Sequence, residues 1–191
     1  MTSNRATGSS SAIRMSSTAG VTSPFGFFDP LGLSKDLNPV ALKKYSEAEL
    51  KHGRVAMLSI LGMAINENTN LFFDGKITGP AIYQFQQADA IMPFFWEIVL
   101  FGIALVEGSN IANGWESIKE TRARGPAAIA GLKEDYINGD LGFDPLGLTP
   151  KSEDDFVNMR TKEINNGRLA MIGVAGAVAQ ELVTGQSIFH L

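Results

Sequence analysis

A short pattern that occurs twice is the feature that most constrains how this chain can fold. Residues 49–58 read Glu-Leu-Lys-His-Gly-Arg-Val-Ala-Met-Leu, and residues 163–172 read Glu-Ile-Asn-Asn-Gly-Arg-Leu-Ala-Met-Ile. The Glu, Gly, Arg, Ala and Met positions are identical, and the other apolar positions remain apolar. Each copy follows a second matched segment, Phe-Asp-Pro-Leu-Gly-Leu, at 28–33 and 143–148. The chain therefore contains an internal duplication of a turn followed by a helix.

Composition narrows the classes of function. Lys plus Arg total 16 against 20 acidic residues, so no electrostatic hold on nucleic acid is expected. The absence of cysteine excludes disulfides, thiolate metal sites and cysteine nucleophiles. His52 and His190 are too few for a multi-histidine zinc site. Because the chain has no phosphate loop, HExxH motif or nucleophile-base pair, we expect no enzyme, and a small membrane enzyme or ion-handling protein is the remote alternative.

The N-terminal region, residues 1–24, is rich in Ser and Thr, carries Arg5 and Arg14, and is followed by the first acidic residue at Asp29. This composition leaves two interpretations open, the remnant of a transit peptide or a disordered tail. Residues 25–191 are predicted to form a single domain.

Two long helices are predicted, over about 39–66 and 152–184. Asn38 suits the N-cap of the first helix, and Pro39 suits its first helical position. Acidic residues occupy the first turn of the other helix, where they favour its N-terminus. The apolar stretch Pro93 to Ile111 predicts a shorter helix between them, over about 90–111. Both long helices exceed the roughly 30 Å of hydrocarbon in a bilayer.

Whether these helices are soluble or span a membrane depends on their apolar residues. The uninterrupted apolar runs at 55–65 and 169–179 are shorter than the roughly 18 residues of a spanning helix, which leaves a soluble three-helix protein open. However, small residues surround the third helix, which fills a soluble core poorly but lets backbones or flat rings approach closely. We therefore expect an all-α membrane protein with three transmembrane helices, the first and third a crossed pseudo-two-fold pair and the second shorter and separate.

The orientation follows from the basic residues that flank the helices. They are concentrated in the N-terminal region and in the 113–150 loop, whereas the loop at about 68–88 contains only Lys76. By the positive-inside rule the N-terminus faces the more positive side of the membrane.

The repeated charges indicate how the two copies pair. Glu49 and Arg54 lie five residues apart, about 140° around a helix, so a salt bridge within one copy is disfavoured. If the copies cross, Glu49 reaches Arg168 while Glu163 reaches Arg54. Two reciprocal ion pairs would then compensate both charges where water is scarce.

Each repeated Glu is followed three residues later, on the same face, by a second polar side chain. This residue is His52 in one copy and Asn166 in the other, and Gln180 returns to a similar face about four turns after Asn166. Imidazole nitrogen, amide oxygen and carboxylate oxygen all suit the open axial position of a metal held in a flat macrocycle. The residues alone leave hydrogen bonds across the helix pair equally open.

Together these motifs resemble the first and third membrane helices of light-harvesting chlorophyll-binding proteins, and the similarity runs from about residue 25 to 191. The resemblance implies that Glu49, His52, Glu163, Asn166 and Gln180 are axial ligands of chlorophyll magnesium. It also implies two carotenoids near the turn residues Phe28, Asp29, Pro30, Leu31, Phe143, Asp144, Pro145 and Leu146. We expect the helix glycines Gly53, Gly62, Gly167, Gly173 and Gly176 to leave room for flat pigments.

The second helix fits the resemblance less closely. Green-plant members typically have a polar ligand, then a Glu eight residues later with a nearby Arg, whereas Glu97 and Glu107 are ten residues apart here and Asn110 stands three after Glu107. Glu107 then binds a magnesium directly, or is protonated or paired through a water. Glu97 is either a ligand or a carboxylate at the membrane interface. His190 is either the ligand of a peripheral chlorophyll or solvated.

The resemblance implies an antenna that passes excitation energy to photosystem I or photosystem II. It would be a multi-pass protein of the plastid thylakoid membrane with a stromal N-terminus, and photosystem core subunits and other antenna proteins would be its partners. The short loops resemble the red-lineage branch, which implies chlorophyll a, chlorophyll c and xanthophylls such as fucoxanthin, together with membrane lipids. A red-algal type with chlorophyll a and zeaxanthin remains open. A photoprotective member that dissipates excitation as heat is the alternative function.

Overall fold

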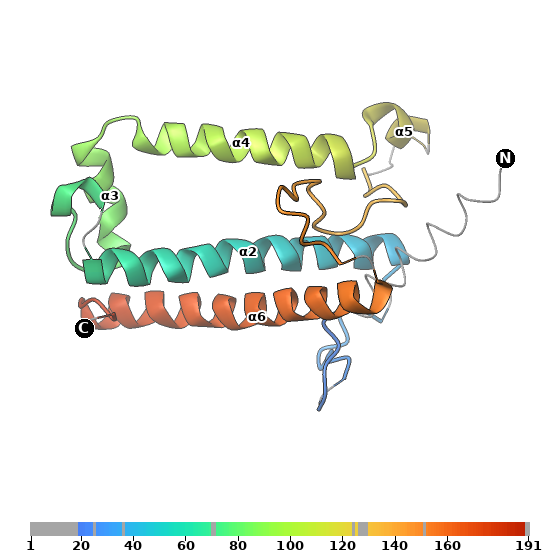
Figure 1. The fold of residues 1–191 in the computed structure, drawn as a ribbon, viewed down its shortest axis with the longest axis horizontal. Helices are drawn as coiled ribbons and strands as arrows, with labels where there is room; N and C mark the ends of the chain where they lie inside the picture. Colours follow the sequence, from blue (N-terminus) through green and yellow to red (C-terminus); the bar gives the residue numbers. More distant parts are fainter. Residues whose placement is uncertain are drawn as a thin grey trace. The chain divides into compact units, whose positions relative to one another are not determined.

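The regular structure of the chain is helical. A computed structural model describes residues 19–24, 26–35, 37–69, 72–123, 125, 130–150 and 152–189. Its elements in chain order are α2 (Pro39–Thr69), the 3-10 helix η1 (Phe72–Gly75), α3 (Ala81–Ile91), α4 (Phe95–Gly114), α5 (Ile118–Ala123) and α6 (Glu153–Thr184) (Figure 1). These residues form two isolated β-bridges and no strand. The all-α prediction is confirmed for the described part of the chain, whereas His190 and most of the N-terminal tail lie outside it.

The chain packs as two compact units, which we describe separately. Unit 1 contains residues 1–51 and 107–165, and unit 2 contains residues 52–106 and 166–191. The helices α2 and α6 contribute their first parts to unit 1 and their remaining parts to unit 2. Each unit therefore contains a segment from both copies of the repeat.

The two long helices begin at the signals read from the sequence. The side-chain oxygen of Asn38 accepts the backbone N–H of Ala41 at 2.8 Å, so Asn38 caps α2 as expected. Three acidic residues occupy the first turn of α6, where they complement the helix dipole. This helix ends before Gly185, whose φ of 65° is left-handed and whose N–H donates to the carbonyl of Glu181 at 2.8 Å.

The middle of the chain differs in part from the prediction. The helix expected over about 90–111 corresponds to α4, which begins at Phe95 and ends at Gly114, whereas α3 occupies residues most of which were expected in the loop at about 68–88. The break between α3 and α4 lies at Pro93: the preceding Met92 has the extended φ of −128° that a following proline favours, and Phe94 has a positive φ of 72°. In unit 2 the Trp96 ring stacks on Phe85 with centroids 4.3 Å apart, so the start of α4 packs against α3.

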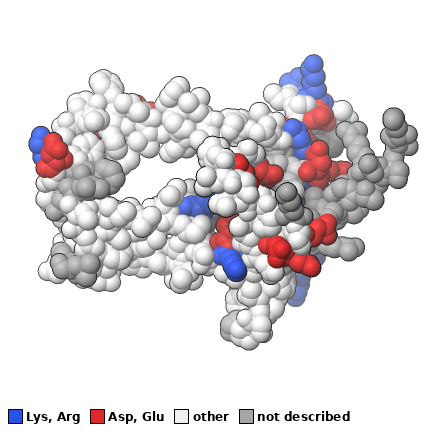
Figure 2. Space-filling view, viewed as in Figure 1, with Lys and Arg blue, Asp and Glu red and all other residues white. Residues whose placement is uncertain are grey.

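The helix α4 is predominantly apolar. Most of its large apolar side chains are more than half exposed, and the surface over it is almost entirely uncharged in Figure 2. Among the described residues, α4 is the one helix that is long and apolar enough to cross a membrane. For α2 and α6, membrane crossing stays a prediction.

Unit 1 is more polar. Charged side chains gather over it in Figure 2, on the starts of α2 and α6 and on the segments that join the helices. Trp115, at the end of α4, forms a bridge with Leu132, and the Lys44 ammonium lies 5.7 Å from the centre of its ring. The 131–139 segment is thereby held beside the start of α2 and the end of α4.

Candidate functional site

The two copies of the repeat meet at their glycines. In unit 2 a Cβ atom placed on Gly53 would lie 3.0 Å from the Cα of Gly167, and one placed on Gly167 would lie 2.9 Å from the Cα of Gly53. Both glycines are buried, and Figure 1 shows α2 and α6 side by side. These two glycines therefore make room for each other's backbone, whereas a Cβ atom placed on Gly62 or Gly176 would meet open space within 4 Å.

Equivalent positions of the two copies are buried to similar extents. Within unit 1, Leu50 and its counterpart Ile164 are 3% and 5% exposed. Within unit 2, Ala56 and Ala170 are both 8% exposed. Together with the glycines these residues repeat at a spacing of three along each helix, so the duplication recurs in the packing as well as in the sequence.

Three of the predicted ligands are exposed on these helices. These are His52 on α2 and the residues Asn166 and Gln180 on α6. Glu49 and Glu163 are half-buried, and a guanidinium nitrogen of Arg160 lies 3.4 Å from Glu163 on the same helix.

His52 and Asn166 each stand beside exposed apolar side chains. After His52 come Val55 and Leu58, which are 64% and 72% exposed, and after Asn166 come Leu169 and Ile172, which are 71% and 73% exposed. A flat, apolar macrocycle with a central metal needs one donor and an apolar surface. Within the described residues, no three His, Asp or Glu side chains gather to hold a bare ion. Isolated donors fit a metal whose other ligands belong to a macrocycle.

The predicted ion pairs Glu49–Arg168 and Glu163–Arg54 would each join a residue of unit 1 to one of unit 2. They stay a prediction.

The repeated turns have matching hydrogen bonds. The carboxylate of Asp29 accepts the backbone N–H groups of Leu33 and Ser34, both at 2.9 Å. Hydrogen bonds from the hydroxyl and then the N–H of Ser34 lower the pKa of Asp29. The first copy of the duplicated segment is thus a turn held by its aspartate, and the second copy has the same arrangement.

In the second turn Asp144 accepts the N–H groups of Leu148 and Thr149 at 2.9 and 3.0 Å. Hydrogen bonds from Thr149, first from its hydroxyl, lower the pKa of Asp144. Both turns leave large apolar side chains exposed, which suits the predicted proximity of carotenoids. These are Phe28, Leu31, Phe143 and Leu146, between 71% and 83% exposed.

Glu97 and Glu107, the two carboxylates of α4, have different surroundings. Glu97 is exposed in the first turn. Glu107 contacts Lys51 of α2 within unit 1, with Nζ and Oε2 2.5 Å apart. The sequence suggested magnesium, a proton or a water for Glu107, and a direct pairing with Lys51 was not anticipated.

Two further acidic residues were missed by the sequence analysis. In unit 2, Glu181 is fully buried and accepts the N–H of Ile82 at 3.0 Å. Its carboxyl group also hydrogen bonds to that of Glu67, which accepts the N–H groups of Ile188 and Phe189 at 2.9 Å. The end of α2, the start of α3 and the end of α6 are thus joined by two side chains. The only sequence signal for them was an acidic residue at the end of each long helix.

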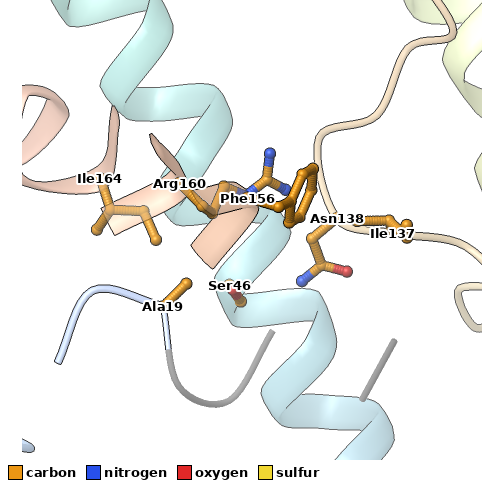
Figure 3. Close-up of a pocket in the computed structure, with 7 residues that line it drawn as sticks. All are labelled: Ala19, Ser46, Ile137, Asn138, Phe156, Arg160 and Ile164. Atoms are coloured by element: carbon orange, nitrogen blue, oxygen red, sulfur yellow. The ribbon is translucent and has the colours of Figure 1, made fainter. Parts of the chain in front are cut away.

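A small cavity in unit 1 is lined by side chains of α2, α6 and two loop segments. Figure 3 shows Phe156 and Arg160 of α6 beside Asn138, and the remaining lining residues are Ala19, Ser46, Ile137 and Ile164. Its volume of about 10 Å³ has room for about one water molecule. This cavity is too small for a pigment, so the exposed helix faces are the candidate site.

The sequence is similar to those of known proteins. A family model described as chlorophyll A-B binding protein matches residues 15–182. The chain is 47% identical over 177 residues to light-harvesting complex stress-related protein 3.2 of Chlamydomonas reinhardtii. The matched region is 90% of this chain and 65% of that protein. It is 42% identical over 163 residues to a fucoxanthin-chlorophyll a-c binding protein of Isochrysis galbana, with coverage of 85% and 74%.

A third relative comes from a flowering plant. The chain is 39% identical over 171 residues to a chlorophyll a-b binding protein of Petunia hybrida. The matched region is 84% of this chain and 59% of that protein. The family match extends over both copies of the repeat and both turns. This chain, with its duplicated helix and its exposed donors beside apolar faces, belongs to the chlorophyll a-b binding protein family.

Proposed function

We propose that this chain is a non-enzymatic light-harvesting antenna that holds chlorophylls and carotenoids at fixed positions and passes excitation energy to a photosystem. The observation that carries the proposal is the agreement between the two copies of the repeat. Each copy has a buried glycine at the contact between helices, an exposed donor one residue earlier, and exposed apolar side chains two and five residues later. The matching family supports the proposal.

The axial ligands we propose are Glu49 and His52 on α2, and Glu163, Asn166 and Gln180 on α6. When bound, chlorophyll supplies the absorption of light. The donors complete the coordination of its magnesium and set the orientation of the ring. The glycine contact and the carboxylate contacts of the helix ends hold the donors at fixed spacing, which rapid transfer between pigments requires. Residues 25–191 form one pigment-binding domain in this proposal.

The pigments are chlorophyll a, chlorophyll c and xanthophylls of the fucoxanthin type. The name of the Isochrysis galbana relative includes fucoxanthin and chlorophylls a and c, which supports this choice. We place the two carotenoids near the repeated turns, whose apolar side chains are exposed.

We locate the protein in the plastid thylakoid membrane, with three spans and its N-terminus in the stroma. Relatives with chloroplastic names support the plastid, and the apolar surface of α4 supports insertion into the membrane. In this membrane its proposed partners are photosystem core subunits and other antenna proteins.

A photoprotective role is the second candidate. It is favoured by the 47% identity to proteins named as stress-related in Chlamydomonas reinhardtii. Both roles need the same bound pigments. They differ in the lifetime of the excited state, which is long in an antenna and short in a protein that dissipates excitation as heat.

The test is to purify the protein from native membranes in mild detergent, then to measure its pigments by chromatography and its chlorophyll fluorescence lifetime. Stoichiometric chlorophyll with xanthophylls and a long lifetime would support the antenna. The same pigments with a short lifetime would favour photoprotection. A folded protein without pigment would reject both, and would favour a membrane protein that uses its carboxylates for chemistry or ion handling.

A further inference from the structure

A row of polar side chains on α2 joins that helix to the rest of unit 1. Lys43, Glu47 and Lys51 are spaced four residues apart, so they lie along one side of the helix. The Lys43 ammonium donates to the carbonyl oxygens of Lys133 and Glu134 at 2.6 and 3.1 Å. Glu47, which is 3% exposed, accepts the Gly139 N–H at 2.6 Å.

The same row continues onto α4. Glu107 and Asn110 are three residues apart on α4 and share a face. The Tyr136 hydroxyl lies 3.2 Å from both Glu47 and Asn110, and the next contact along the row is the ion pair of Lys51 with Glu107. Two successive contacts therefore fix how α4 lies along α2 within unit 1.

Asn110 occupies the place where a cation on the same helix would face Glu107. Asn110 is 2% exposed, and its side chain already contacts the Tyr136 hydroxyl. The charge that faces Glu107 comes instead from Lys51, on another helix. We propose that Lys51 is the counter-ion of Glu107, and that it keeps the second carboxylate oxygen available as the axial ligand of a chlorophyll on α4. This inference rests on the proposed function.

The geometry of the pair suits this role. Lys51 bonds to Oε2 of Glu107, and the Glu107 side chain remains 45% exposed, so a ring can approach its other oxygen. Ligation by a carboxylate adds a negative charge to a chlorophyll, and an unbalanced charge is costly in hydrocarbon. Lysine is a compact point charge that can satisfy one oxygen, whereas the forked guanidinium of arginine tends to engage both. Lys51 is thus a positioning residue that makes a site on α4 depend on α2.

The experiment uses the full chain assembled with chlorophylls and xanthophylls. Four variants are compared with the wild type: Lys51→Met, Lys51→Arg, Glu107→Leu and the double variant Lys51→Met with Glu107→Gln. Chlorophylls per protein are counted by chromatography, the missing pigment is identified from absorption difference spectra, and helix content is followed by circular dichroism. Lys162→Met, at an exposed position of α6, is the control for loss of a lysine charge.

We expect Lys51→Met and Glu107→Leu to lose the same chlorophyll and the same absorption band. Lys162→Met should retain it, because the site is unchanged, whereas Lys51→Arg should bind it less fully, because a guanidinium tends to engage both carboxylate oxygens. The double variant should regain the pigment, since a glutamine oxygen is a neutral ligand that needs no counter-ion. Regained pigment in a chain that still lacks Lys51 separates charge balance from folding.

Two results would overturn the inference. One is full chlorophyll content in Lys51→Met or in Glu107→Leu. The other is a double variant as depleted as Lys51→Met, which would mean that Lys51 acts through packing. A wild-type protein that assembles with no chlorophyll at all would instead reject the proposed function, so the two failures are distinguishable.

Discussion

At the scale of single residues, Gly53 and Gly167 show how closely the two copies are matched. Each is the nearest neighbour of the other across unit 2, and neither has room for a methyl group. Their spacing of about 3 Å from a built Cβ to the opposing Cα is below the usual contact distance of 3.5–4.0 Å between carbon atoms. The helices must therefore separate if either glycine gains a side chain.

We predict that Gly53→Ala and Gly167→Ala each destabilise the protein by about 1–3 kcal/mol, the usual cost of overpacking. Thermal unfolding followed by circular dichroism would measure this change. Because the first substitution already separates the helices, the double variant should cost less than the sum of the two. Gly62→Ala and Gly176→Ala are matched controls, since they lie on the same helices in open space and should be neutral or stabilising. Additive costs at Gly53 and Gly167 would contradict a shared contact.

Single residues also show what could not be predicted from the sequence. The spacing of Glu49 and His52 predicted a shared helix face, and the repeat predicted equivalent roles for its two copies. It did not distinguish Gly53 and Gly167, which face each other, from Gly62 and Gly176, which face open space. That difference depends on where two helices touch, and a local pattern does not contain it.

At the scale of elements, the repeated turns couple structure to pH. The native pKa values of Asp29 and Asp144 lie below the ordinary value of 3.8 because hydrogen bonds favour their charged forms. A depressed native pKa stabilises the turn at pH values above the ordinary value. This contribution is lost as the pH falls from about 3.8 through the lowered native pKa.

We therefore predict that both turns stay protected at neutral pH and loosen only in strong acid. Hydrogen exchange at Leu33 and Ser34, and at Leu148 and Thr149, would follow the loss of the carboxylate acceptors. Asp29→Asn should increase exchange at neutral pH in the first turn and leave the second unchanged. Asp89→Asn, at an exposed position of α3, is the control. Unchanged exchange in Asp29→Asn would mean that the carboxylate does not hold the turn.

The ends of the helices in unit 2 give a second prediction at this scale. Glu67→Ala removes the acceptor of the Ala81, Ile188 and Phe189 N–H groups. Unpaired N–H groups are costly where water is excluded, so we expect a loss of about 1–3 kcal/mol. Hydrogen exchange should increase at these three amides, and Asn68→Ala, at an exposed neighbour, should leave them protected. Equal protection in both variants would show that Glu67 is dispensable.

Some helices could be predicted from the sequence more accurately than others, for physical reasons. Asn38 and Pro39 fixed the start of α2 because capping is local. The apolar stretch Pro93 to Ile111 predicted one helix over about 90–111, which corresponds to α4, whereas α3 lies mostly in the segment expected as a loop and is separated from α4 by a break at Pro93. The break depends on the extended backbone that Pro93 imposes on Met92 and on the stacking of Trp96 on Phe85. The second of these joins residues eleven positions apart, beyond the reach of a periodicity argument.

At the scale of the whole molecule, the duplicated Glu and Arg residues predict that the copies depend on each other. If Arg54 neutralises Glu163, Arg54→Leu removes that counter-charge from a proposed ligand of the other copy and leaves beside it the Arg160 guanidinium, 3.4 Å away on the same helix. We expect pigment to be lost from both α2 and α6, as measured by chromatography of the assembled protein. Lys162→Met should lose none. Loss from a single helix, with the fold retained, would contradict reciprocal pairing.

The chain also contains its own reporters. It has two tryptophans, Trp96 stacked on Phe85 in unit 2 and Trp115 beside Lys44 in unit 1. Each unit thus has one tryptophan in a distinct environment, an aromatic stack in one and a nearby cation in the other. Replacing either tryptophan by phenylalanine would leave a chain whose tryptophan emission reports on a single unit. The order in which the two units assemble could then be followed without attaching a label.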